Sequence, residues 1–196
     1  MKKSTNKWMK TMAGVVLAAV ILLISSCGTK AQPKDESRAT VSNVKAPDID
    51  LHAAVITNNM DAVKQHIAAG SDLNVRDPFG GSSPLITASL FGNVEAVKLL
   101  IAAGAEVNVT NNEGSTALHT ASFFCYPEVV KILLAKGADK SIKNKYGSTA
   151  LESIVVPYEN VEGIYKMMGK QFAPMGLKLD FARIEKTRPE IAELLK

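Results

Sequence analysis

The chain has 196 residues and a formal net charge of +4, which alone would favour a polyanionic partner. Four of its 23 basic residues lie among the first ten positions, and all 19 acidic residues follow Cys27. Beyond residue 26 the chain is therefore formally neutral, with 19 basic residues (23 − 4) against 19 acidic ones. A protein without a basic surface cannot neutralise a phosphate backbone, so the composition excludes nucleic-acid binding.

Residues 1–26 have the layout of an export signal. Four lysines precede an uninterrupted apolar run over residues 14–24, and two serines follow it. The run is shorter than the roughly 20 residues that a membrane-spanning helix needs. It is therefore typical of a signal that is cleaved, rather than of a permanent membrane span.

The sequence Ile24-Ser25-Ser26-Cys27 ends this segment and resembles the lipobox of bacterial lipoproteins. The resemblance implies cleavage before Cys27, a diacylglycerol on its sulfur and usually an acyl chain on its amino group. Two or more acyl chains give stable membrane anchoring. An ordinary secretory signal with a cysteine at its cleavage site is the alternative. Lipidation of Cys27 would leave Cys125 without a partner for a disulfide.

The residue after Cys27 is Gly28. In Gram-negative lipoproteins an aspartate at this position often signals retention in the inner membrane. We therefore expect an outer-membrane lipoprotein that faces the periplasm. Residues 27–47 are polar, mixed in charge and without helical or strand periodicity, which is typical of a flexible tether.

Residues 48–196 contain an internal repeat. Three segments start 33 residues apart (116 − 83 and 149 − 116), and a fourth, upstream, fits at a spacing of 34, with the extra residue near Gly80 and Gly81. The starts read Ile49-Asp50-Leu51-His52, Ser83-Pro84-Leu85-Ile86, Thr116-Ala117-Leu118-His119 and Thr149-Ala150-Leu151-Glu152. A glycine recurs later in the first three segments, as Gly70, Gly104 and Gly137. This period and these landmarks resemble the ankyrin repeat.

The resemblance implies an all-α solenoid of helix pairs that are joined by β-hairpin loops. About four repeats are expected, over residues 48–81, 82–114, 115–147 and 148–196. Ankyrin repeats bind proteins, so we expect a protein partner of unknown identity and no catalysis, cofactor or metal. We expect the chain to be attached to the membrane through lipid on Cys27. We also expect it to be a monomer.

The landmarks also predict local structure. Ser83, Thr116 and Thr149 precede apolar helices, where their hydroxyls can cap free N–H groups. His52 and His119 occupy the histidine position of the repeat. The resemblance implies that both histidines form hydrogen bonds within or between loops rather than bind a metal.

The fourth repeat is interrupted. Pro127 and Pro189 hold equivalent positions at the second helices of the third and fourth repeats, but they lie 62 residues apart. The fourth repeat therefore contains 29 inserted residues (62 − 33), roughly over 157–186. Apolar side chains at helical spacing predict an amphipathic helix within the insert. Thr187 and Glu190 form a capping-box pattern, which predicts that the last helix begins there. The insert is either a cap over the open end of the solenoid, which we favour, or a ligand-binding element.

Two groups of side chains are candidate partner-binding residues. Positions that do not face neighbouring repeats form an apolar row, and exposed apolar rows mark interaction sites. The row consists of Ile56, Leu90, Phe123 and Val156, and Phe91 and Phe124 lie beside it. The second group is Phe79 and Tyr146 at the tips of the loops. The alternatives are that the insert folds back and buries part of the row, or that some of these positions turn into the core.

A different class of function would use Cys125 together with the insert, in an envelope enzyme or a redox-protective protein. Cys125 stands near His119, but no orienting acid or oxyanion arrangement is legible in the sequence. We therefore expect an ordinary, partly buried thiol.

Overall fold

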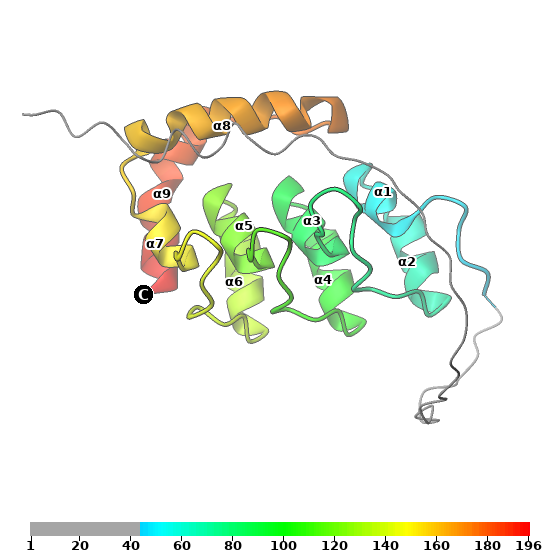
Figure 1. Cartoon of the computed structure of the whole chain (residues 1–196). Coiled ribbons are helices and arrows are strands. Elements are labelled where there is room, and N and C mark those ends of the chain that lie inside the picture. Colours follow the sequence, from blue (N-terminus) through cyan, green and yellow to red (C-terminus); the bar gives the residue numbers. More distant parts are fainter. Residues whose placement is uncertain (1–43) are drawn as a thin grey trace, which may run out of the picture. The chain divides into compact units, whose positions relative to one another are not determined.

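The computed structural model describes residues 44–196; the expected export signal, Cys27 and nearly all of the expected tether lie outside this range. The described chain folds into nine α-helices and one short 3-10 helix (Figure 1). These are α1 (Leu51–Ile56), α2 (Met60–Ala68), α3 (Pro84–Phe91), α4 (Val94–Ala102), α5 (Ala117–Phe123), α6 (Pro127–Ala135), α7 (Ala150–Ile154), α8 (Tyr158–Phe172), η2 (Ala173–Met175) and α9 (Phe181–Leu195).

The helices form two stacked rows, as the repeat period predicts. The first helices, α1, α3, α5 and α7, contact one another in that order, and the second helices, α2, α4, α6 and α9, do the same. Between the rows lies a continuous core of small and branched side chains, among them Ala88, Val97 and Leu118. An all-α ankyrin solenoid is confirmed.

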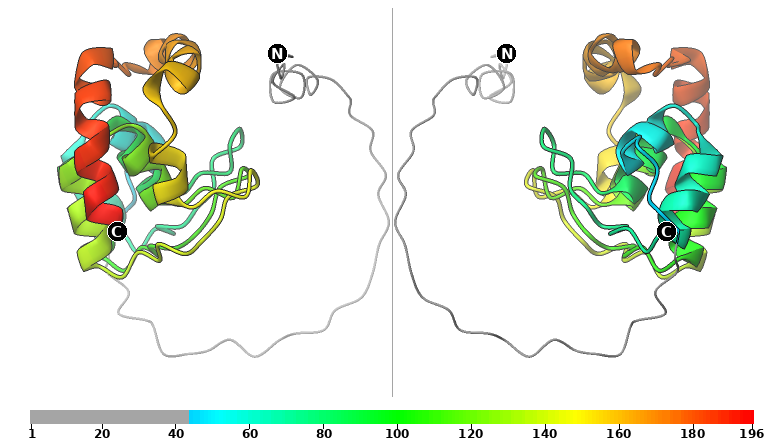
Figure 2. Two further views of the ribbon diagram at one scale, coloured as in Figure 1. Left: turned by 90° about the vertical axis from the view of Figure 1, so that its left-hand side faces the viewer. Right: turned by 90° about the vertical axis from the view of Figure 1, so that its right-hand side faces the viewer.

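The loops between repeats are hairpin-shaped, and Figure 2 shows three of them projecting side by side from the helices. Each is closed at its tip by a backbone hydrogen bond, for example from Asn111 N to Ser115 O (3.0 Å) and from Asn144 N to Ser148 O (3.0 Å). The pairing stops there, and no strand is assigned within residues 44–196. The expected β-hairpins are therefore tight turns on extended arms.

The predicted helix caps are present. The side chains of Ser83, Thr116 and Thr149 each accept a hydrogen bond from the backbone N–H three residues ahead. Asp50 does the same for α1. Each cap satisfies one of the N–H groups that the first turn of a helix leaves without a partner.

The last helix begins earlier than the capping-box pattern predicts. Asp180 is the N-cap, where its carboxylate accepts a hydrogen bond from Arg183 N (3.0 Å). Thr187 lies inside α9 and donates its hydroxyl to Arg183 O (2.7 Å) instead of capping. Pro189 lies inside the helix as well. The insert therefore forms α8, η2 and the first turns of α9, and the prediction of a helix start at Thr187 is wrong.

The C-terminal half of α9 occupies the second-helix row. A line of ion pairs runs along that row, from α2 to α4, α4 to α6 and α6 to α9, over 3.4, 3.8 and 3.4 Å. The pairs are Lys64–Glu95, Lys98–Glu128 and Lys131–Glu190. Both partners of each pair are about half exposed, so each pair contributes little stability. Within the described range, no helix is long and apolar enough to cross a membrane.

Candidate functional site

Helices α1 and α3 present apolar side chains to solvent at their C-terminal ends. Ile56 ends α1, and Leu90 and Phe91 end α3. All three are half-buried, and none belongs to the set of side chains packed against the core. Burial of the rest of this strip by a partner would be favourable, because apolar area removed from water is stabilising. This part of the predicted row remains accessible.

The insert covers the next part of the row. The Phe123 ring stacks on Tyr165 of α8, with 4.5 Å between the ring centroids. Phe124 is only 2% exposed and contacts Phe123 edge to face. Val156 lies just before α8 and is exposed. The expectation that Phe124 is exposed is therefore wrong, since the insert folds back over the end of α5, and Phe123 is half-covered.

Polar contacts from the insert hold it in this place. The Tyr165 hydroxyl donates to Phe123 O (2.6 Å) and accepts from Arg188 Nη1 (2.8 Å). The buried Arg188 guanidinium also donates to Ile154 O (2.6 Å) and Val156 O. These carbonyls lie at the ends of α5 and α7, where helices leave acceptors without partners. Tyr165 of the insert and Arg188, just beyond it, thus cap the ends of α5 and α7, and α8 runs along one edge of the repeats (Figure 1).

A second arginine adds to this attachment. Arg183 donates to Cys125 O (2.5 Å) and Phe124 O (3.2 Å), and its guanidinium lies 5.1 Å from the centre of the Tyr126 ring. Sequence reasoning missed both arginines. A signal was present for Arg188, which lies four residues after the buried Ile184 and so falls on the buried stripe of α9.

The first loop presents Phe79, which is 93% exposed. Its turn is fixed by Asp77, whose carboxylate accepts hydrogen bonds from the N–H groups of Phe79 (2.8 Å), Gly80 (2.7 Å) and Ser82 (2.5 Å). Burial alone would raise the pKa of Asp77, but these bonds outweigh it and lower the pKa from its ordinary value of 3.8. Phe79 is thus an exposed aromatic side chain on a backbone with little freedom.

The loops are also tied to one another. Asn112 N donates to Gly80 O (2.8 Å), and Lys145 N donates to Glu113 O (2.9 Å). Tyr146, the second predicted tip aromatic, is 48% exposed and donates its hydroxyl to Glu113 (2.8 Å). The tips therefore form one connected surface rather than three independent loops.

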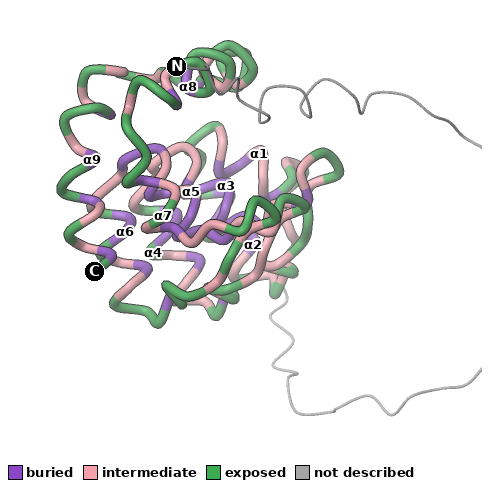
Figure 3. Tube along the Cα trace, turned by 60° about the vertical axis from the view of Figure 1, so that its left-hand side comes forward, coloured by how far each residue is buried: buried purple, intermediate pink, exposed green. Residues whose placement is uncertain are grey.

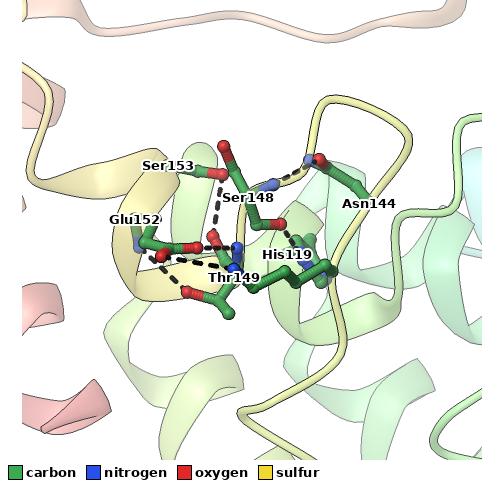
Figure 4. A network of polar contacts seen from close by, with 7 residues as sticks. His119, Asn144, Ser148, Thr149, Glu152 and Ser153 are labelled. Atoms are coloured by element: carbon green, nitrogen blue, oxygen red, sulfur yellow. Dashed lines mark hydrogen bonds and ion pairs between the residues drawn. The ribbon is translucent and has the colours of Figure 1, made fainter.

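The two repeat histidines have the structural role that the resemblance implies. His52 contacts Thr87 Oγ1 and Val75 O, each at 3.0 Å. His119 contacts Thr116 Oγ1 (2.9 Å) and Ser148 O (3.1 Å), which links the loop to the start of α7 (Figure 4). Burial lowers the pKa of His119, which keeps the ring neutral at physiological pH. No group of three potential metal ligands lies together in residues 44–196.

Cys125 occupies the turn between α5 and α6, where repeat 2 has Gly92. Both residues adopt left-handed backbone conformations, with φ of 57° for Cys125 and 65° for Gly92. The thiol is buried, which raises its pKa from 9.0 to about 11, although Arg188 and Arg183 oppose the shift. Such a thiol is protonated at neutral pH and is a poor nucleophile.

The comparisons with known proteins agree with this geometry. Residues 51–144 match the family model described as ankyrin repeats in three copies. A solved structure with 38% sequence identity and a TM-score of 0.51 is described as the ankyrin repeat domain of Bcl-3, a unique member of the IkappaB protein family. The match covers 53% of this chain and 45% of that one, so the chain spans less than half of the length of the protein that it resembles. Among curated proteins, no sequence matches the chain.

Figure 3 places buried residues where the helix pairs face one another, and many exposed ones along α8 and in the loops. The repeat period, the two rows of helices and the family match all indicate one architecture. Ankyrin repeats imply a protein-interaction module with a protein partner. The described domain is an ankyrin-repeat solenoid, and residues 51–144 consist of ankyrin repeats.

Proposed function

We propose that this chain is a membrane-anchored ankyrin-repeat module that binds a protein partner in the bacterial envelope and has no catalytic activity of its own. The observation that carries the proposal is the fixed, 93% exposed side chain of Phe79 on the connected loop surface. Aromatic side chains on rigid backbones provide much of the binding energy of interfaces. The apolar strip of Ile56, Leu90 and Phe91 provides a second contact area.

Anchoring is the sequence-based part of the proposal. It is supported by the lipobox-like Ile24-Ser25-Ser26-Cys27 and by the short apolar run before it. The residue after Cys27 is glycine, which favours the outer membrane with the domain in the periplasm. Metabolic labelling with palmitate tests this directly: we expect label on the native chain and none on Cys27→Ser. Sucrose-gradient separation of the two membranes then assigns the location.

The alternative of an enzyme or redox-protective protein has less support. Cys125 is buried, and its raised pKa keeps it protonated. The hydrogen-bond partners of His119 are Thr116 and Ser148, not the thiol. A cysteine nucleophile needs an adjacent base or a lowered pKa. These contacts favour a structural role for Cys125.

Partner binding is tested by crosslinking in intact envelopes, followed by affinity purification of the chain. We expect the crosslinked partner to be lost when Phe79 and Phe91 are both changed to serine. Val44→Ser removes a 44% exposed apolar side chain outside this surface and serves as the control. Circular dichroism verifies that the fold is retained. Undiminished capture by the double variant would show that the partner does not bind here.

A further inference from the structure

Residues 163–179, within the insert, differ in charge from the rest of the domain. Between Glu162 and Asp180 the chain carries three lysines, Lys166, Lys170 and Lys178, and no carboxylate. Lys166 pairs with Glu162 over 2.8 Å. Lys170 and Lys178 are exposed and have no ion pair among the described residues. The segment therefore has a local excess of positive charge on a chain that is neutral beyond residue 26.

Apolar side chains reach solvent beside these lysines. Met167 is 51% exposed, and Ile164 and Met175 are also exposed. In Figures 1 and 2, α8 runs along one edge of the described domain, away from the loop tips. Methionine is flexible and polarisable, so it adapts to irregular apolar surroundings. Apolar and cationic groups are thus exposed together on one element.

A shallow cavity of about 320 Å³ opens on the same element, between α8 and the segment that leads into α9. Leu179 and Phe181 lie on its α9 side, and Gly169 and Ala173 on the other. Lys166 and Lys170 complete its lining. An apolar chain with a negatively charged head matches such a lining.

We propose that residues 163–179 dock on an anionic lipid surface. The main apolar face of α8, with Val161 and Tyr165, packs on the domain, so docking uses the outward side, where Ile164 and Met167 are exposed together with Lys166 and Lys170. Exposed apolar side chains next to lysines bind in the plane of a membrane interface. The lysines are attracted by anionic headgroups, and the exposed methionines enter the boundary below them. The positive charge is spread along the whole segment, which fits the diffuse charge of a lipid surface better than one acidic site on a protein.

The docking element is preformed. Tyr165 is buried on the inner side of α8, where Arg188 and Phe123 hold its hydroxyl. The exposed side of α8 therefore does not need to order on binding, so docking does not incur that entropy cost. The inference rests on the proposed function only for its setting, because an anchor at Cys27 would keep this surface near a bilayer.

The test uses residues 28–196, which lack the apolar run of residues 14–24, Cys27 and the only tryptophan, Trp8. Met167→Trp then places one reporter on α8, and Phe79→Trp in a second protein places it on a loop tip. Tryptophan emission is recorded with vesicles of phosphatidylcholine alone or with phosphatidylglycerol added. We expect a blue shift for the α8 reporter only with the anionic vesicles, and no shift for the loop reporter.

Charge variants give the expected size of the effect. Each lysine near an anionic surface contributes about a fivefold factor, so Lys170→Gln with Lys178→Gln should weaken the docking seen by the α8 reporter about 25-fold. Lys136→Gln with Lys140→Gln makes the same charge change elsewhere and should have no such effect. Circular dichroism verifies the fold of every variant.

Three results would overturn the inference. They are no response of the α8 reporter, an equal response of that reporter to neutral vesicles, and a photocrosslinker at position 167 that captures an acidic protein rather than lipid in cells. Because the chain is unlipidated and the α8 reporter leaves the loops untouched, failure here is distinct from failure of the anchor or of partner capture.

Discussion

The Arg188 guanidinium donates a hydrogen bond over 2.8 Å to the Tyr165 hydroxyl, which in turn donates to Phe123 O over 2.6 Å. One chain of hydrogen bonds thus links α9, α8 and the end of α5. A buried charge is tolerated only where hydrogen bonds surround it, and Arg188 has acceptors on α7 and beyond as well. This relationship attaches the insert to the ends of the first-row helices α5 and α7.

Arg188→Met tests that attachment. The substitution keeps apolar bulk but leaves Ile154 O and the Tyr165 hydroxyl without their donor. We expect the free energy of unfolding in urea to fall by about 3 kcal/mol. Arg183→Met is the comparison; Arg183 is half-buried, so its loss should be smaller. Equal stability of Arg188→Met and the native chain would contradict this account of the attachment.

The turn between paired helices provides a second test. A Cβ on Gly92 would lie 2.5 Å from the Tyr126 ring, in addition to the strain of a positive φ. Gly92→Ala should therefore destabilise the chain by about 1–3 kcal/mol. Cys125→Gly relieves left-handed strain but removes a buried thiol, so its net change should stay within about 1 kcal/mol. Thermal unfolding of both variants distinguishes these outcomes.

Burial of Cys125 predicts a loss of stability in alkali. The pKa rises from 9.0 in the unfolded chain to about 11 in the folded one. The folded state therefore holds the proton more tightly, so this stability is full below pH 9 and is lost as the pH rises towards 11. The loss should approach about 3 kcal/mol relative to Cys125→Ala, both in a Cys27→Ser background. Parallel stability curves for the two proteins between pH 8 and 11 would refute the prediction.

Asp77 has polar equivalents in the next two loops, where Asn111 and Asn144 accept hydrogen bonds from the turn in the same way. Asp77→Asn should therefore keep the first loop and cost less than about 1 kcal/mol. Asp77→Ala removes every acceptor and should cost about 1–2 kcal/mol. Hydrogen exchange at the Phe79, Gly80 and Ser82 amides reports the loop directly. Equal protection in the two variants would rule out this role for the carboxylate.

Much of the solenoid was predictable from local chemistry. Ser83, Thr116 and Thr149 cap their helices because hydroxyl oxygens can accept from free N–H groups wherever an amphipathic helix begins. The extra residue near Gly80 and Gly81 is accommodated at the tip, where Asp77 N pairs with Ser82 O. Such features depend on a few neighbouring residues, so the repeat pattern reveals them.

The insert was less predictable because its structure depends on distant contacts. Asp180 and Thr187 are both good N-cap residues, and packing of the whole α9 stripe decides in favour of Asp180. Phe124 and Phe91 hold equivalent positions in neighbouring repeats, yet Phe124, whose carbonyl accepts from Arg183, is buried and Phe91 is only half-buried. No local pattern shows where a segment 40 or more residues later in the chain will fold back, as Tyr165 does onto Phe123.

The backbone hydrogen bonds from Asn112 to Gly80 and from Lys145 to Glu113 have a consequence for recognition. They fix the separation of Phe79, Glu113 and Tyr146 along the solenoid. A partner must therefore present its contacts at the same interval. An inserted residue in the middle loop would weaken binding without removing any contact side chain. Selectivity in this module would then depend on distances within its backbone as much as on the residues displayed.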